Sequence, residues 1–448
     1  MIVPPSSPEQ RVPRVRKHLS ADALYALLRS GFEEIPDHRA RQTPISLPDA
    51  LMSAFAMFSL KDPSLLAFDE RRNDANMRNL FQIARVPSDT HMREILDPVE
   101  PDHLRPSFDD VLRELQRGKA LEPFVFYKGC YLASLDGTGY FSSSAVHCGS
   151  CLEKVHKKTG EVTYHHQMLG AVLMHPDFRE VIPLAPEPIQ KQDGETKNDC
   201  ERNASKRWLR RFRKNHPHLN LIVVEDGLAS NAPHIRELKN LGFHFILGAK
   251  PGDHAFLFGQ ALAAFDADRV TTVSWTEKDG TYCEIAFAND LPINESNQDL
   301  RVNWLYYIEC NPDGTESVFT WVTDLPISRG NARLLVRGGR CRWKIENETF
   351  NTLKNQGYHY EHNYGHGKKN LSVVFAMLMM LAFLVDQVQQ LCCPLFRAVL
   401  AKVESKRVLW ERLRSHFWHF TLHSMKHLYQ VILYDLGKEL PIPELDTS

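Results

Sequence analysis

Apolar residues recur at helical spacing in the N-terminal part of the chain, up to about residue 121. After a Ser46 cap, Leu51 and Phe55 fall on one face of a predicted helix. Residues 79–96 predict two shorter helices separated by a Val-Pro-Ser break. This arrangement is typical of a helix-turn-helix that binds DNA, and also of two helices that only pack together, so both interpretations remain open.

From Phe124 onward the pattern changes to short apolar runs with the length of strands. These runs alternate with segments that predict helices, and one of these helices, residues 198–215, is strongly basic. Strands that alternate with helices are typical of a layered α/β fold with a mixed sheet. The predicted strands are residues 124–127, 131–135, 164–174, 180–184, 219–224 and 243–248, and a further predicted helix covers residues 230–241.

A second run of strands interrupts this layer between residues 251 and 328. Alternating apolar and polar residues, with Asp-Gly turns at 279–280 and 313–314, predict a β-rich insertion. Helices return from about residue 331. The predicted domains are an N-terminal helical, DNA-binding domain (1–121), a core in two parts (122–250 and 329–393), the β-rich insertion (251–328) and a C-terminal helical segment (394–448).

Composition changes this picture little. A chain of 448 residues is long enough for two or three domains, and 43% apolar with 24% charged residues is an ordinary globular profile. The net charge of −1 hides a local excess, because residues 197–214 hold eight Lys or Arg against two acids. Nine unevenly spaced cysteines without a signal peptide indicate a reducing cytoplasm. The most apolar stretch, residues 371–385, is too short to span a bilayer, so we expect a buried helix and no membrane role.

Three acids in distant segments carry the candidate chemistry. Asp136 and Asp226 each follow a mainly apolar run and precede Gly, so we expect each of them where a strand stops and the backbone turns. Glu346 lies within a predicted helix. A single Asp-Gly pair is an ordinary turn, but three carboxylates together supply the oxygen ligands that Mg²⁺ prefers, and two such ions assist displacement at phosphorus. The set indicates phosphodiester chemistry on nucleic acid.

Three segments carry a family resemblance: Leu135-Asp-Gly-Thr, Val223-Val-Glu-Asp-Gly and Arg340-Cys-Arg-Trp-Lys-Ile-Glu. In this order and context the chain resembles a DDE-type transposase of a bacterial insertion sequence, in the cut-and-paste group with a β-rich insertion before its last acid. The likeness spans roughly residues 75–390. It implies a ribonuclease-H-like mixed-sheet catalytic core and two Mg²⁺ ions, which Mn²⁺ can replace. The catalytic residues and metal ligands that it implies are Asp136, Asp226 and Glu346.

Two glutamates compete for the role of the last acid. Glu346 shares a helix face with Arg342, four residues earlier, whereas Glu348 points elsewhere, and the family signature places an Arg four residues before its Glu. The chain departs from the signature twice. Gly339 stands where the family often has Tyr, and the Lys expected seven residues after Glu346 comes one residue later, as Lys354.

The candidate DNA contacts are basic side chains. The resemblance implies that Arg342 and Lys354 contact DNA phosphate, which supplies charge but no sequence information. For Arg342 the alternative is an ion pair with Glu346. The basic helix is either a phosphate-binding track or a solvated face, and its candidate DNA-binding residues are Arg207, Arg210, Arg211 and Lys214.

Two further groups have both a functional and an ordinary interpretation. Cys148 and Cys151, followed by His156, His165 and His166, resemble half of a zinc site, or are simply thiols of a loop and a core. The tryptophans of the β-rich insertion are core residues by default. In transposases of this build an aromatic side chain from the insertion can stack on a flipped base, and the candidates are Trp275, Trp304 and Trp321.

The function predicted from the sequence is Mg²⁺-dependent cleavage at transposon ends and strand transfer to target DNA. By analogy with the family, the partners are the inverted repeats and the target DNA, the protein acts as a dimer on DNA, and its location is the bacterial cytoplasm, associated with the nucleoid. Two rival functions remain: a catalytically inactive DNA-binding derivative of a transposase, and a metal-dependent nuclease without strand transfer.

Overall fold

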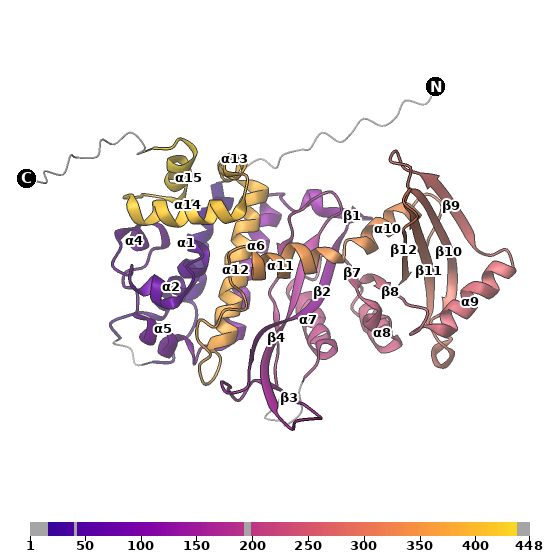
Figure 1. Cartoon of the computed structure of the whole chain (residues 1–448), viewed down its shortest axis with the longest axis horizontal. Coiled ribbons are helices and arrows are strands. Elements are labelled where there is room, and N and C mark those ends of the chain that lie inside the picture. The colour runs from indigo at the N-terminus through magenta and orange to yellow at the C-terminus, as the bar shows by residue number, and fades with distance from the viewer. Residues whose placement is uncertain (1–16, 40–42, 192–198, 437–448) are drawn as a thin grey trace, which may run out of the picture. The chain divides into compact units, whose positions relative to one another are not determined.

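The computed structural model describes residues 17–39, 43–191 and 199–436 (Figure 1). The chain divides into two compact units. The helical unit comprises Met1–Pro123, Ser143–Ser150 and Thr352–Ser448, and the sheet unit comprises Phe124–Ser142 and Cys151–Asn351.

The helical unit is built around two apolar helices, α2(Leu47–Leu60) and α12(Leu371–Cys392). Ser46 caps α2, because its Oγ accepts a hydrogen bond from Asp49 N at 3.1 Å, and Lys61 ends it in a left-handed conformation with φ 57°. Around them lie α1(Ala21–Glu33), α3(Leu65–Asp69), α4(Ala75–Phe81), α5(Asp89–Leu96), α6(Arg105–Arg117), α13(Pro394–Val403), α14(Lys406–His419) and α15(Met425–Leu433).

Among the described residues, α12 is the one helix long and apolar enough to cross a bilayer, with 22 residues and a mean hydropathy of 2.2. Within the helical unit it packs against α2, α5, α6 and α13. Because 94% of its most apolar window is buried, helix packing accounts for its composition. The predicted buried helix at 371–385 is thus confirmed, and it extends to Cys392. A helix buried on every side has no polar stripe that marks its solvent-facing side. Its sequence therefore did not indicate that it packs with the N-terminal helices.

The C-terminal helices pack on the N-terminal helices, with α15 against α1 and α14 against α2. The Phe417 ring lies 5.9 Å from that of Phe81 (centroid to centroid) and Asn76 Nδ2 donates to Phe417 O at 2.6 Å. The C-terminal helical segment therefore packs within its own chain, on the helices of the N-terminal part.

The sheet unit contains one 12-stranded sheet in the described residues, with the order β3-β4-β2-β7-β8-β12-β11-β10-β9, and β1, β5 and β6 pair beside this path. It is a mixed sheet. The strands β2, β7 and β8 run parallel, whereas each neighbouring pair along the path β8-β12-β11-β10-β9 is antiparallel. The strands are β1(Val125–Tyr127), β2(Cys130–Ser143), β3(Leu152–Val155), β4(Val162–Met174), β5(Ile182–Pro183), β6(Glu187–Ile189), β7(Leu221–Glu225), β8(His244–Gly248), β9(Thr271–Thr276), β10(Tyr282–Pro292), β11(Arg301–Cys310) and β12(Glu316–Thr323).

The β-rich insertion is present, but it extends the core sheet instead of forming a separate one. Its last strand, β12, pairs with β8 of the core, with Trp321 opposite Gly248. Its first element is the helix α9(Ala255–Asp266), which the sequence analysis did not predict. Figure 1 shows β9 to β12 side by side with β8 as one continuous layer.

The predicted helix over 331–355 is divided into three parts. α10(Ala332–Arg340) is followed by the π-helix η6(Ile345–Phe350), which carries Glu346, and then by α11(Asn351–Asn355). The basic helix α7(Glu201–Asn215) begins later than predicted, with Cys200 as its N-cap. Of the first residues of the predicted helix, Asp199 and Cys200 precede α7, and residue 198 lies outside the described residues. The helix α8(Ala232–Asn240) follows β7 as expected.

Candidate functional site

Asp136 and Asp226 lie on neighbouring parallel strands in the same register. Ser134 of β2 is opposite Val224 of β7, and each aspartate comes two residues later. Neighbouring strands lie about 4.8 Å apart. Asp226 directly follows β7, where its carboxylate accepts from Leu228 N at 2.9 Å. The prediction that a strand also ends at Asp136 is wrong, because β2 continues through the Asp-Gly pair to Ser143.

Arg342 links Glu346 to Asp136. Its Nη1 atom lies 2.6 Å from Glu346 Oε1 and 3.8 Å from Asp136 Oδ2. The predicted alternative for Arg342, an ion pair with Glu346, is therefore present. Glu346 stands in a π-helix, a geometry that often occurs at functional sites. Glu348, by contrast, pairs with Arg179 at 3.1 Å, so the two glutamates have different partners.

A fourth acid, Glu201, joins this group from the first turn of α7. Its Oε1 atom accepts a hydrogen bond from Gly137 N at 3.1 Å. A Cβ atom at Gly137 would lie 2.6 Å from Glu201 Oε2, so only glycine at this position allows the glutamate to approach. Glu201 is one of the two acids of the basic segment 197–214, and it was not among the predicted site residues. The glycine after Asp136 was the signal of a close approach, but it was interpreted as a turn residue.

Burial and neighbouring negative charges raise the pKa values of Asp136 and Glu201. Burial, followed by the negative charge of Glu201 and then that of Glu346, raises the pKa of Asp136 to about 7, although Arg342 opposes the shift. Burial, followed by the charge of Asp226, likewise raises the pKa of Glu201. Carboxylates that repel one another in a partly buried site are stabilised by a cation. Their hard oxygen donors fit Mg²⁺, so the side chains present agree with the metal that the resemblance implies.

This raised pKa predicts a pH-dependent stability. The carboxyl of Asp136 titrates near 7 in the folded protein and near 3.8 in the unfolded chain. Between these two pH values the folded state binds more protons than the unfolded chain, so the free energy of unfolding falls as the pH rises. The loss of stability is complete above pH 7. Without divalent ions, Asp136→Asn is therefore expected to raise the thermal midpoint, by an amount that grows from pH 5 to pH 8. Mg²⁺ should raise the midpoint of the wild type at pH 8 more than that of the variant. A difference between the proteins that does not change with pH would contradict this.

Behind Asp226, a buried Glu225 fixes the strand to two helices. Its carboxylate accepts from Ser205 Oγ of α7 at 3.1 Å and lies 2.6 Å from His234 Nε2 of α8. Burial lowers the pKa of His234, but the charge and the hydrogen bond of Glu225 together outweigh it and raise the pKa. The end of β7 is therefore held in place independently of any ligand.

Most of the predicted basic track on α7 is engaged within the protein. Arg207 pairs with Glu187 at 2.8 Å, Arg211 pairs with the same glutamate at 2.5 Å, and Arg210 pairs with Glu237 at 2.5 Å. Of the candidates on this helix, Lys214 is exposed. In the helical unit, Lys354 pairs with Glu361 at 2.8 Å. The ion pairs favour a structural role for the three arginines, and the DNA contacts of this helix and of Lys354 remain predictions.

The missing Tyr at position 339 has a structural explanation. A Cβ atom at Gly339 would lie 2.5 Å from Cε2 of Trp321, so the tryptophan occupies the space that a side chain would need. Trp321 and Trp304 are buried, as the ordinary interpretation predicted. Trp275 is half-buried, with the Arg333 guanidinium 4.0 Å from its ring centroid. Trp343, beside Arg342, is 43% exposed and was not among the predicted candidates.

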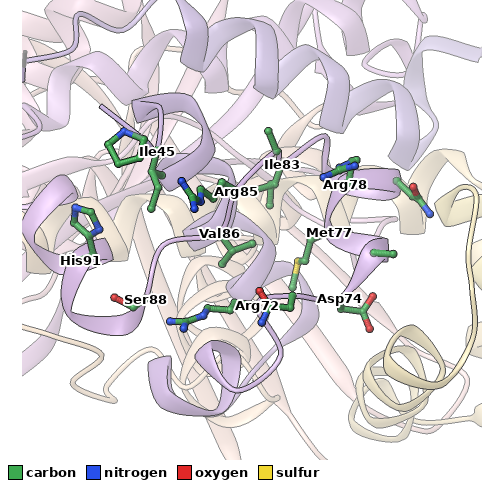
Figure 2. A pocket seen from close by; sticks show the side chains of 15 residues that line it. Ile45, Arg72, Asp74, Met77, Arg78, Ile83, Arg85, Val86, Ser88 and His91 are labelled. Atoms are coloured by element: carbon green, nitrogen blue, oxygen red, sulfur yellow. The ribbon is translucent and has the colours of Figure 1, made fainter. Parts of the chain in front are cut away.

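The helical unit has a polar pocket at the predicted helix-turn-helix. A cavity of about 770 Å³ is lined by Arg72, Arg78 and Arg85 and by His91 (Figure 2). Arg72 pairs with Asp69 at 3.0 Å. Within the described residues, Arg78 and Arg85 are exposed and form no ion pair. Ser88, the N-cap of α5, also lines the pocket, and its side chain makes no capping hydrogen bond.

No family model and no curated protein matches this chain. A solved structure described as the synaptic complex of piggyBac transposase with hairpin DNA is similar over 97% of this chain and 88% of that chain, with 9% sequence identity and a TM-score of 0.41. At that TM-score and identity, the likeness does not identify a function for this chain.

Proposed function

We propose that this chain is a DNA transposase that cleaves the ends of its own element and joins the freed 3′-hydroxyl to target DNA. One observation carries the proposal. Asp136 of β2, and Asp226 directly after the parallel strand β7, each come two residues after the paired residues Ser134 and Val224, while Arg342 contacts both Asp136 and Glu346. Strand pairing and the Arg342 contacts thus connect the acids of three distant segments within the sheet unit. The motif resemblance selects the same three acids.

The proposal assigns a role to each side chain. Asp136, Asp226 and Glu346 hold the metal, and Arg342 compensates their charge and contacts a DNA phosphate. When held by these residues, Mg²⁺ would assist the displacement at phosphorus by acting on the attacking and the leaving oxygen. Glu201 positions the Asp136 segment through Gly137 N. The mixed sheet that carries these residues is proposed to be ribonuclease-H-like, as the resemblance implies.

The helical unit is proposed to bind the ends of the element. Arg78 and Arg85 offer two exposed cations, and Ser88, the N-cap of α5, lines the same pocket. Phosphate groups are the natural ligands of such a surface. A dimer on DNA is part of the proposal, since two ends must be cut and joined together.

The proposal is tested with duplex DNA that carries the inverted repeats flanking the gene. Purified protein with Mg²⁺ should cleave next to a repeat and join the 3′ end to a target plasmid, and a chelator should abolish both steps. Binding without cleavage would indicate an inactive DNA-binding derivative of a transposase. Cleavage without joining would indicate a metal-dependent nuclease. Absence of specific binding to the repeats would overturn the proposal.

The pocket makes a separate prediction. The double variant Arg78→Ala, Arg85→Ala should bind end DNA more weakly, and the slope of log affinity against log salt should become shallower by about 0.9 for each lost phosphate contact. Arg113→Ala is a matched control, because Arg113 is an exposed arginine of α6 outside the pocket, paired with Asp110 at 2.8 Å. Equal effects of both variants would mean that the pocket has no special role.

A further inference from the structure

A buried cysteine–histidine pair lies away from the acids of the proposed active site. Cys151 Sγ and His166 Nε2 are 3.4 Å apart, and both residues are only 1% exposed. The pairing of β3 with β4 explains their meeting. Leu152 is opposite His165, so Cys151, one residue earlier, faces His166. Nothing in the proposed transposition chemistry uses this pair.

The distance between these two atoms matches that between two ligands of one zinc ion. Zinc–sulfur bonds of about 2.3 Å and zinc–nitrogen bonds of about 2.05 Å at a tetrahedral angle separate the two ligand atoms by roughly 3.6 Å. A direct thiol–imidazole hydrogen bond has a similar length, so a third ligand and an experiment must distinguish the two.

Cys148 provides the third ligand. Gly149 and Ser150 form a turn between Cys148 and Cys151, and the first and last Cα atoms of such a turn lie within about 7 Å of each other. A Cys-x-x-Cys pair on a turn is the commonest half-site of structural zinc. Neither cysteine is in a disulfide bond.

The surroundings of His166 fix its ring. Tyr140 of β2 stacks on it with ring centroids 5.9 Å apart and an interplanar angle of 14°. The other histidines predicted from the sequence fit less well. His156 is exposed and its Nε2 lies 2.8 Å from Thr163 Oγ1, and His165 points to the opposite face of β4 because side chains alternate along a strand.

We infer that Cys148, Cys151 and His166 bind one Zn²⁺ ion in a structural site that fixes the turn before β3 to strand β4. Two thiolates and one imidazole are held by protein, and a further nitrogen or oxygen ligand completes the tetrahedron. The two thiols lose their protons on binding, as zinc thiolates require. The proposal does not rest on the proposed function, so each can fail without the other.

The first test is the metal content of the full-length protein after equilibration with Zn²⁺ and gel filtration. We expect one zinc per chain by mass spectrometry, and a first shell with two sulfur atoms by X-ray absorption. Cys148→Ser, Cys151→Ser and His166→Ala should each retain less than a tenth of this zinc. Cys200→Ser is the matched control, because Cys200 is an exposed cysteine outside the site, and it should retain all of it.

A second measurement keeps the inference testable if a variant fails to fold. In the wild type, zinc should protect Cys148 and Cys151 from alkylation, and a chelator should expose both thiols together while Cys200 reacts at the same rate throughout. Wild-type protein without zinc, a first shell with fewer than two sulfur atoms, or a disulfide between Cys148 and Cys151 in the freshly purified protein would overturn the inference.

Discussion

Glu346→Gln abolishes Mg²⁺-dependent cleavage in the proposed mechanism, whereas Glu348→Gln leaves most of it. We expect a loss of at least about a hundredfold at Glu346, since even residues behind a metal ligand change affinity or activity by about 10–100-fold. The structural reason is the difference in partners. Glu346 shares Arg342 with Asp136, and Glu348 pairs with Arg179. Cleavage of end DNA by the purified variants measures the effect.

Binding of the same DNA serves as the control for folding. Both variants should bind the end duplex with similar affinity, because glutamine keeps the size of the side chain and only the metal site of one of them changes. If Glu348→Gln is the inactive variant, the last acid has been assigned to the wrong glutamate. Equal activity of both would remove the proposed metal site altogether.

The largest expected change in stability lies in the helical unit. Lys61 is 1% exposed at its side chain, and its ammonium group donates to Asp386, which also accepts from Tyr358 OH at 2.6 Å. The ammonium lies 4.2 Å from the ring centroid of Trp410. Asp386→Ala leaves this cation buried and unpaired, so we expect the free energy of unfolding to fall by about 3–5 kcal/mol. Denaturant titration of the full chain, followed by circular dichroism, measures it.

The double variant Lys61→Met, Asp386→Leu is the matched control. It removes both charges and keeps the apolar volume, so it should be close to the wild type in stability or above it. Burial lowers the pKa of Lys61 and raises that of Asp386, and the charge of each residue opposes the shift of the other. A double variant as unstable as Asp386→Ala would show that the cost comes from lost packing.

The acids were predictable because each carries a local signal. Asp226 follows a buried strand, and Glu346 stands four residues after an arginine, so single segments of sequence were enough. Glu201 could not be selected in this way. It reaches Gly137 from a segment far along the chain, through a contact that exists only in the folded sheet. The continuation of β2 past Asp136 was missed for a related reason, because Asp-Gly is a turn signal by composition and the neighbouring strands overrule it.

The arrangement of the chain into units was less predictable. The strands of the insertion have the alternation expected of a separate layer, and only the pairing of β12 with β8 joins them to the core sheet. Likewise, α12 is apolar on all sides, so the sequence gives no direction to its packing. Periodicity identifies which face of an element is buried, but it does not identify the partner element that covers that face.

The contact between Gly339 and Trp321 restricts how this sequence can diverge. A Tyr at position 339 collides with the indole, and a small residue at 321 alone leaves an empty space against a glycine. Each single replacement passes through a less stable protein, whereas the exchange of both residues together restores the packing. The two positions are therefore expected to change together, so that the summed side-chain volume of the strand position and the helix position stays constant.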